Sequence, residues 1–405
     1  FPHFNRLAGR PVKPSPLHEL LKSKGAVHEE VFGFERPRWF AKDGVAQEDH
    51  YSFKHNVVDD IVAKEVEGVR KSVGIIDVTA FTKVRIDGPD AYALLDRLTA
   101  NKMPQKDGSI TLTHMLNRRG RIELETTIVR LAGDSFYLVC AAFFEQRLLD
   151  HLAQNADGAN VSVTSLSENR SALAINGPNA RKVLAECTDA RLDNASFRWL
   201  SAQNISVAGH TVLAMRVSYA GELGWELHMP NTACLDVYTA LSKAGEPFGI
   251  VDYGSFAMNV MRMEKGFKGA GELTNEVTLP EADVMRFVRT DKEYLGKDAT
   301  LANADNMPWV CAYLDIEPDG VNDGHGGEAV MFDGQVVGST ASVVYGPTVG
   351  RILAFAYIKP HAANPGTALE VVIAGEPRPA KVLAEPAYDP TSLLPRTDAV
   401  TEPAE

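Results

Sequence analysis

The sequence repeats one short pattern, as Lys83-Val-Arg-Ile-Asp-Gly-Pro-Asp-Ala91 and again as Ala172-Leu-Ala-Ile-Asn-Gly-Pro-Asn-Ala180. Each stretch alternates apolar residues, reaches a Gly-Pro turn and then begins a helix. Further strand-like runs follow each copy, among them residues 128–131 and 212–217. The predicted fold class is therefore α+β with two copies of one unit, and the sheets are expected to be antiparallel because turns join neighbouring strands.

The pattern of the chain changes toward its C-terminal end. Short apolar runs separated by Gly, Asp and Pro predict an all-β module there, either a barrel or a sandwich. The predicted organisation is an N-terminal junction segment over residues 1–50, α+β modules over 51–165 and 166–300, and the β module over 301–395. The tail after these modules, 396–405, is expected to be disordered.

Composition limits the classes of function. The chain has 405 residues, of which 45% are hydrophobic and 23% are charged, as in ordinary globular proteins. Its formal charge is 41 − 53 = −12. That charge argues against a nucleic-acid partner, because phosphate binding needs a basic face. An anionic ligand would need a local cluster of Arg and Lys.

The sequence predicts no membrane span, no disulfide and no metal centre. The longest apolar run, Phe136 to Phe144, is far shorter than the ~18 residues that span a bilayer. The chain begins at Phe1, so we expect it to be trimmed, processed or cut from a longer protein. No dinucleotide-binding glycine pattern, nucleophile elbow or zinc-like His spacing occurs. Widely spaced cysteines predict free thiols in a reducing compartment, and they are Cys140, Cys187, Cys234 and Cys311.

A first candidate acid, Glu125, lies in Arg119-Gly-Arg-Ile-Glu-Leu-Glu-Thr-Thr-Ile-Val129. On a strand it shares one face with Glu123, while the apolar residues share the other face. A solvated outer face is the ordinary interpretation of this pattern. The alternative is a carboxylate beside a substrate amine, which orients the amine and takes up its proton. His114 precedes the loop Met115-Leu-Asn-Arg-Arg-Gly120, and it is either near a site or structural.

A second candidate acid, Glu222, lies in Tyr219-Ala-Gly-Glu-Leu-Gly-Trp-Glu226. The glycines allow a tight turn that can approach a flat ligand closely. A carboxylate there can accept two hydrogen bonds from an amino-pyrimidinone edge, although an exposed hairpin turn has the same pattern. Arg262 lies near the end of a predicted helix, 255–265, which Gly266 would cap. It can hold a ligand carboxylate or form an ordinary surface ion pair.

In combination, these motifs resemble the glycine-cleavage T-protein family. Residues 74–91 are similar to the opening of its folate domain, and the motifs at 115–120, 219–226 and 261–266 follow in the same order. The stretch Phe34-Glu-Arg-Pro-Arg-Trp-Phe-Ala41 is most similar to the folate-binding C-terminal half of dimethylglycine and sarcosine dehydrogenases. The resemblance covers nearly the whole chain.

The resemblance implies a cloverleaf of two ferredoxin-like α+β modules and a C-terminal β-barrel around a tetrahydrofolate pocket. It makes Glu125 the catalytic group that meets the folate nitrogen, where T-proteins have Asp and some relatives have Glu. It assigns the pterin to Glu222, with Tyr219 beside it. Arg262 and Met115 are assigned to the same cofactor.

The function implied is tetrahydrofolate-dependent one-carbon transfer. The methylene unit of an oxidised N-methyl amine, such as dimethylglycine or sarcosine, would become 5,10-methylenetetrahydrofolate. The chain would be a transferase subunit or half of an amine demethylase. Its partner would be a flavoprotein subunit or a missing N-terminal flavin domain. The expected location is cytoplasmic, in the bacterial cytosol, or the mitochondrial matrix in a eukaryote.

Two alternatives to this function stay open. One is a direct methyltransferase for O-, S- or N-methyl donors, because the same fold serves both reactions. The other is a non-catalytic folate-binding subunit. A related group of iron–sulphur assembly factors is disfavoured, because Lys265-Gly266 is followed by Phe267 rather than Cys. Relatives often carry an aromatic-Gly pair where this chain has Gly269-Ala270-Gly271, so a different pocket wall is expected.

Overall fold

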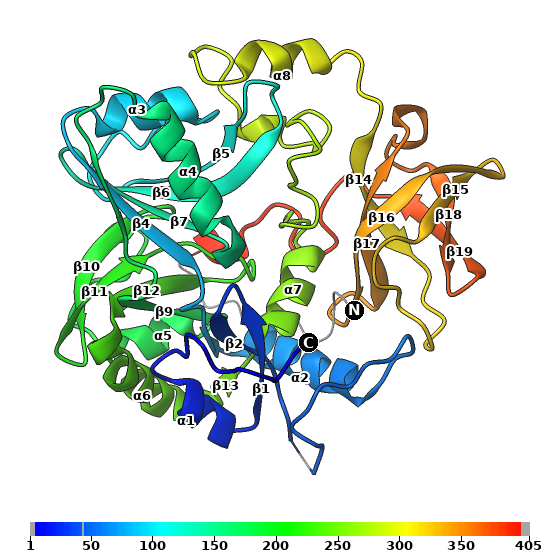
Figure 1. The fold of residues 1–405 in the computed structure, drawn as a ribbon. Coiled ribbons are helices and arrows are strands. Elements are labelled where there is room, and N and C mark those ends of the chain that lie inside the picture. Colours follow the sequence, from blue (N-terminus) through cyan, green and yellow to red (C-terminus); the bar gives the residue numbers. More distant parts are fainter. Residues whose placement is uncertain (1–4, 43, 398–405) are drawn as a thin grey trace.

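The computed structural model describes residues 5–42 and 44–397. In Figure 1 the two sheets and the helices that pack on them lie on the left, and a small barrel lies on the right. Helix α7 lies between the sheets and the barrel. A short N-terminal unit lies beneath the sheets. It consists of helix α1 (His18–Ser23) and the antiparallel hairpin of β1 (Ala26–Val31) and β2 (Phe34–Phe40).

The first sheet has five antiparallel strands in the order β5-β6-β7-β4-β8. One of its faces packs under helices α3 (Ala91–Leu98) and α4 (Glu145–Asn155), where Leu95, Leu124 and Leu148 are fully buried. The strands are β4 (Thr82–Asp87), β5 (Ile110–Leu116), β6 (Ile122–Ala132), β7 (Ser135–Cys140) and β8 (Ser162–Ser165).

The second sheet has six strands in the order β10-β11-β12-β9-β3-β13, and only its short β13–β3 pair is parallel. One face packs under helices α5 (Ala180–Ala185) and α6 (Cys234–Gly245). The strands are β3 (Gly74–Asp77), β9 (Arg170–Asn176), β10 (Ala202–Val207), β11 (His210–Met215), β12 (Gly224–Pro230) and β13 (Val251–Asp252).

The repeated sequence pattern forms the same local structure in both sheets. In one copy β4 leads through Gly88 into α3, and in the other β9 leads through Gly177 into α5. Both glycines have positive φ, +135° and +125°. A side chain at either position would also collide with backbone, since an added Cβ would lie 2.3 Å from Asn160 O or 2.4 Å from Ser72 O. The local pattern therefore fixes the strand–turn–helix unit.

The two sheets face each other through the surfaces that their helices leave free. Val129 and Tyr137 of the first sheet pack against Leu213 and Met215 of the second. The second sheet includes β3, which lies before the predicted module boundary at 165/166, together with strands that lie after it. The boundary itself stays a prediction.

The C-terminal module is a closed barrel in the order β14-β17-β16-β15-β18-β19, and β14 pairs with β19 to close it. The α+β fold class with antiparallel sheets and a C-terminal barrel is thereby confirmed, and closure leaves no exposed sheet edge. The strands are β14 (Val310–Ile316), β15 (Ala329–Phe332), β16 (Gln335–Gly346), β17 (Arg351–Ile358), β18 (Ala368–Ile373) and β19 (Glu376–Val382).

Two further helices connect the modules. Helix α2 (Val57–Lys71) begins with a capping box at Asn56, and it packs against α7 (Ser255–Glu264). Helix α7 ends at Glu264, and Gly266 caps it as the sequence predicts, with a φ of +63° and an N–H that donates to the carbonyl of Met263.

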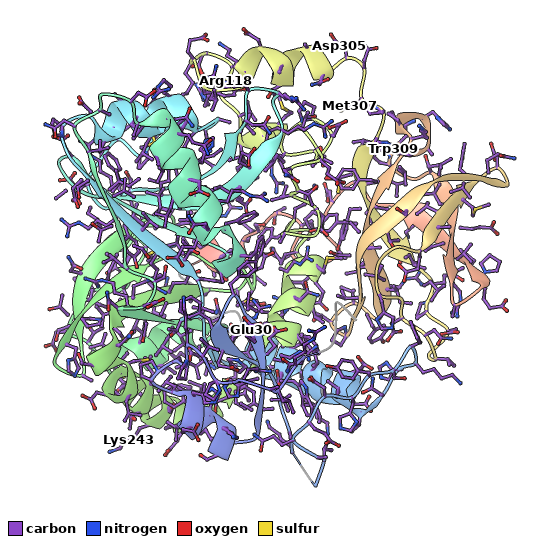
Figure 2. The ribbon with its side chains drawn as sticks, viewed as in Figure 1. Glu30, Arg118, Lys243, Asp305, Met307 and Trp309 are labelled. Carbon is purple, nitrogen blue, oxygen red and sulfur yellow. The ribbon has the colours of Figure 1, made fainter. Side chains whose placement is uncertain are left out.

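The segment after α7 carries the remaining helix, α8 (Lys297–Asn303). The turn between β5 and β6, which holds Arg118, lies beside α8 (Figure 2). The predicted disordered tail falls mostly on residues 398–405, which lie outside the described residues. Short 3₁₀ segments occur at Ala142–Phe144, Asn231–Ala233, Glu246–Phe248, Met285–Phe287, Pro360–Ala362 and Leu394–Arg396.

No helix within residues 5–42 and 44–397 has the length and apolar character to cross a bilayer.

Candidate functional site

Glu125 points into the space between the two sheets. It alternates along β6 with Leu124, which lies in the core under α3 and α4, and it shares a face with Val129, which packs toward the second sheet. Its side chain keeps 26% of its surface exposed. The acid is therefore partly enclosed by the opposite sheet rather than on a solvated outer face.

His114 lies directly opposite Glu125 on the neighbouring strand β5. Its Nε2 is 3.3 Å from Glu125 Oε1, and its side chain is fully buried. The ring of Phe287 packs beside the imidazole, with 5.9 Å between the ring centroids. This pair is one polar feature of the first sheet that faces the intersheet space.

A second acid, Glu226, faces the same space from β12. Trp225 and Leu227 point into the core under α5 and α6, so the alternating residues Glu226 and His228 point toward the first sheet. His228 Nε2 lies 3.3 Å from Glu226 Oε2, and its Nδ1 lies 3.1 Å from the Tyr137 hydroxyl on β7. Burial lowers the pKa of His228, although Glu226 raises it, so the imidazole is held toward its neutral form.

Glu226 is not among the site residues predicted from the sequence motifs. The signal was present, because Trp225, Leu227 and Met229 alternate with Glu226 and His228 along β12. A strand with one apolar face and two ionisable residues on the other places both polar side chains together.

Tyr219 lies beside the loop that follows α7. Its ring stacks on Phe267 at 6.3 Å between centroids, and its hydroxyl donates to Lys268 O at 3.3 Å. Burial raises the pKa of Tyr219, which the Arg262 charge lowers and the Glu125 charge raises. The structure thus brings Tyr219 within electrostatic reach of two other predicted site residues, Glu125 and Arg262.

Glu222 has a different environment from Glu125 and Glu226. Its side chain is 3% exposed, and its Oε1 receives both the Arg70 guanidinium at 2.8 Å and the Tyr388 hydroxyl at 2.9 Å. A pterin could reach this carboxylate only by displacing these donors. The predicted contact between Glu222 and a pterin stays a prediction.

Arg262 is also held by protein groups. Its Nη1 donates to Glu272 Oε2 at 2.9 Å and to Phe267 O at 3.0 Å. Its Nε donates to Asn259 at 2.9 Å, and its Nη2 donates to Ser342 of β16 at 3.1 Å. These bonds fasten the loop after α7 to the barrel, and they leave little donor capacity for a ligand carboxylate.

Met115 lies on the face of β5 opposite to His114. Its side chain is fully buried, and it packs with Leu95, Leu98 and Leu124 under the helices. A ligand between the sheets would meet His114 rather than the Met115 side chain. The predicted role of Met115 in cofactor binding stays a prediction.

Models of known protein families match both the part of the chain that forms the two sheets and the C-terminal barrel. Residues 17–292 match the GCVT N-terminal domain, and residues 310–389 match the glycine cleavage T-protein C-terminal barrel domain. The chain belongs to the glycine cleavage T-protein family. The resemblance inferred from the sequence motifs is confirmed.

Individual relatives place the chain within the T-protein family. It is 33% identical to mitochondrial dimethylglycine dehydrogenase of Mus musculus, over 95% of this chain and 45% of that protein. It is 31% identical to 4-methylaminobutanoate oxidase (formaldehyde-forming) of Paenarthrobacter nicotinovorans, over 96% of this chain and 48% of that protein. The chain therefore spans about half the length of the curated relatives it matches.

Among solved structures, the glycine cleavage system aminomethyltransferase T from Bartonella henselae matches with a TM-score of 0.80. The match covers 94% of this chain and 99% of that chain at 22% identity, which establishes the shared T-protein fold.

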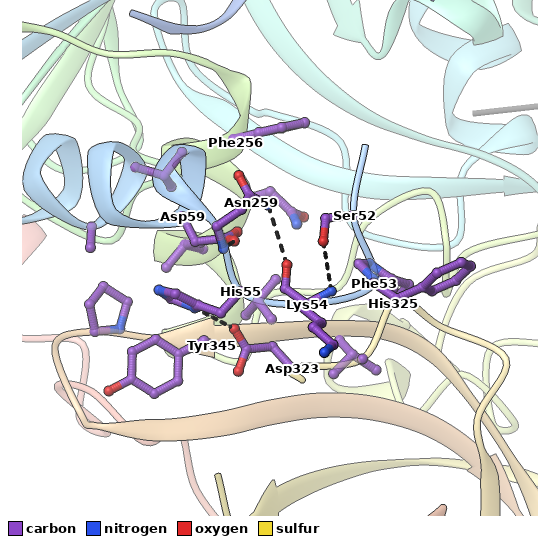
Figure 3. A pocket seen from close by; sticks show the side chains of 18 residues that line it. Ser52, Phe53, Lys54, His55, Asp59, Phe256, Asn259, Asp323, His325 and Tyr345 are labelled. Atoms are coloured by element: carbon purple, nitrogen blue, oxygen red, sulfur yellow. Dashed lines mark hydrogen bonds and ion pairs between the residues drawn. The ribbon is translucent and has the colours of Figure 1, made fainter. Parts of the chain in front are cut away.

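A separate cavity of about 170 Å³ lies where the N-terminus of α2 meets the barrel (Figure 3). His55 forms an ion pair there with Asp323, with 3.0 Å between Nδ1 and Oδ2. Glu125, Tyr219 and Glu226 do not line this cavity. Within the described part of the chain, no cluster of three or more His, Cys, Asp or Glu side chains is arranged to hold a metal ion.

Proposed function

We propose that this T-protein family member binds tetrahydrofolate between its two sheets and transfers a one-carbon unit at the oxidation level of formaldehyde. The observation that carries the proposal is that Glu125 and Glu226, from opposite sheets, both point into the space between the sheets, and that Glu125 acts electrostatically on Tyr219. A reduced pterin has an amino-pyrimidinone edge with two donors and an amine on its other ring. Two acids on opposite walls match these two ends.

The polar groups of the site also fit a polar ligand. Among the described residues, neither ring nitrogen of buried His114 has a hydrogen-bond partner, and Glu272 Oε1, on the loop held by Arg262, has none either. Glu226 receives only a long contact from His228, at 3.3 Å. Buried polar atoms are normally paired, so the unpaired atoms of His114 and Glu272 support a polar ligand near these residues.

In the proposed mechanism, Glu226 accepts the two hydrogen bonds of the amino-pyrimidinone edge and fixes the orientation of the ring. Bound tetrahydrofolate would supply a nucleophilic amine for the electrophilic carbon of an iminium, whose amine would be the leaving group. Glu125 would take up the proton that the folate nitrogen loses and pass it to the departing amine. The two sheets hold the reactants together and exclude water, which would otherwise release formaldehyde.

The proposed donor is an oxidised N-methyl amine, which the names of the relatives support. Dimethylglycine dehydrogenase and the formaldehyde-forming 4-methylaminobutanoate oxidase both act on N-methyl groups. Since this chain matches about half of each relative, the oxidation step is proposed to belong to a flavin-containing subunit or domain. The four cysteines are free thiols, which supports the cytosol or the mitochondrial matrix as the location.

Anaerobic calorimetry with tetrahydrofolate tests the proposal directly. Saturable binding with one site per chain is the expected result. An absence of heat up to millimolar folate would overturn it. Identification of the product distinguishes the two folate-dependent reactions, because a direct methyltransferase yields methyl- rather than methylene-tetrahydrofolate.

A further inference from the structure

We infer that His114 is a positioning residue, which donates a hydrogen bond to Glu125 and holds that carboxylate toward the folate nitrogen. The inference rests on the proposed function and adds a residue to the same site. His114 and Glu125 are directly paired residues on β5 and β6, and their side chains leave the sheet on the same face. Their register therefore places the imidazole beside the carboxylate without help from any loop.

The surroundings of His114 leave Glu125 as its polar neighbour. The side chain is fully buried, and 3.3 Å separates Nε2 from Glu125 Oε1. Neither ring nitrogen has a hydrogen-bond partner among the described residues. Phe287, in the 3₁₀ segment Met285–Phe287, packs beside the ring. A buried histidine usually has a hydrogen-bond partner for at least one ring nitrogen. His228, for example, contacts Tyr137 and Glu226.

The chemistry needs only the neutral imidazole. With the proton on Nε2, His114 donates to Glu125 Oε1, and the second carboxylate oxygen is left free for the folate amine. During the reaction the proton moves from that amine to the free oxygen of Glu125. His114 keeps its own proton throughout. The present contact is long, and catalytic hydrogen bonds commonly shorten when the ligand closes the site.

Two variants separate this role from packing. His114→Phe keeps a flat ring against Phe287 but removes the donor, whereas His114→Gln keeps an N–H donor. His151→Phe is the matched control, since His151 is also buried and its Nε2 also lacks a partner among the described residues, but it lies on α4, which covers the opposite face of the first sheet from the intersheet space. Turnover is measured as methylenetetrahydrofolate formed from tetrahydrofolate and the iminium of sarcosine with formaldehyde, above the uncatalysed rate.

The expected result is a split between binding and turnover. His114→Phe should lower kcat about 10- to 100-fold and leave the Kd for tetrahydrofolate within about twofold. His114→Gln should recover most of the rate, and His151→Phe should retain it. Normal turnover in His114→Phe, or a loss of folate affinity that equals the loss of turnover, would overturn the inference.

A spectroscopic measurement keeps the inference testable if a variant does not fold. Long-range ¹H–¹⁵N spectra of histidine-labelled protein report which ring nitrogen carries the proton. The Nε2–H tautomer is expected for His114, with a shifted signal in Glu125→Gln. An Nδ1–H tautomer would overturn the inference.

Different results would exclude the proposed function and the role of His114. If the protein does not bind tetrahydrofolate, or Glu125→Gln retains full turnover, the proposed function fails and the inference fails with it. If folate binds, Glu125→Gln is inactive and His114→Phe is fully active, only the role of His114 is excluded.

Discussion

Arg70 and Glu222 form an ion pair inside the protein, with 2.8 Å between Nη1 and Oε1 and side chains only 5% and 3% exposed. The same guanidinium pairs with Glu264 of α7 at 2.9 Å, and the ring of Tyr388 lies 4.1 Å from Cζ. One cation on α2 thus holds the turn before β12, helix α7 and the C-terminal segment together. Glu222 thereby fixes the turn that follows Tyr219 and leads into β12, the strand that carries Glu226.

Replacing Arg70 tests this junction. Arg70→Met leaves two buried carboxylates without their cation, so we expect the free energy of unfolding to fall by about 3–5 kcal/mol. Urea denaturation measures the loss. Lys71→Met is the neighbouring control, because the Lys71–Glu67 pair is exposed to solvent and should contribute little to stability. Equal stability of the two variants would show that the buried pair has no special role.

Removal of the charge should have different effects at the two acids of the stretch Tyr219–Glu226, which are Glu222 and Glu226. Glu226→Gln should weaken tetrahydrofolate binding by about 1–3 kcal/mol, because it loses a charged acceptor for the pterin edge. Glu222→Gln should mainly lower stability, because it breaks the pair with Arg70. Calorimetry on both variants decides between them. The sequence alone assigned the pterin to Glu222, so that assignment predicts the weaker folate binding in Glu222→Gln instead.

Glu125→Gln should separate binding from chemistry. The amide preserves the shape of the side chain but cannot take up a proton, so turnover should fall about 100-fold or more. The Kd for tetrahydrofolate should stay within about threefold. Single-turnover product formation and calorimetry on the same preparation check both parts. A variant with normal turnover would exclude Glu125 as the proton acceptor.

Gly269→Ala should narrow the proposed pocket. An added Cβ would lie 2.8 Å from the Tyr219 hydroxyl, which then has to move from its contact with Lys268. We expect folate affinity to fall by about 1–2 kcal/mol through this overpacking. Tyr219→Phe removes the atom that collides, so affinity in the double variant should exceed that of Gly269→Ala. Additive losses in this double-mutant cycle would contradict the steric explanation.

Glu65 should make the free energy of unfolding depend on pH. Burial raises the pKa of this α2 carboxyl to about 8, although the N–H groups of Gly254 and Phe40 lower it. The usual value is 4.5, so between these values the folded state binds more protons than the unfolded state. The contribution of Glu65 to stability is therefore greatest at low pH and is lost as the pH rises toward 8.

The corresponding measurement is urea denaturation across pH 5 to 8. The contribution of Glu65 should fall by at most about 1.4 kcal/mol per pH unit. Glu65→Gln cannot ionise and should lack this component of the slope. Identical slopes in the two proteins would mean that Glu65 already carries its charge in the folded state.

Local patterns in the sequence predicted much of the secondary structure. The apolar spacing of α2 and α7, and the Gly-Pro turns at Gly88 and Gly177, depend on residues a few positions apart. A helix with one apolar stripe or a glycine at positive φ is the same in any surroundings. The motifs near Glu125 and Tyr219 were likewise sufficient to indicate the family.

The partners of the charged residues required the tertiary structure. Nothing near Glu222 in sequence indicates Arg70, which is 152 positions away, and Arg262 pairs with Glu272 through a loop of irregular structure. The period of a strand separates its two faces, but it does not say which surface covers each face.

The sequence by itself therefore determined the strands, the helices and the set of acids available for a site. Only the tertiary structure decided that Glu125 and Glu226 face one space while Glu222 is enclosed with Arg70. The physical reason is that secondary structure follows from local periodicity. Burial and ion pairing instead follow from contacts between segments that are distant in the chain.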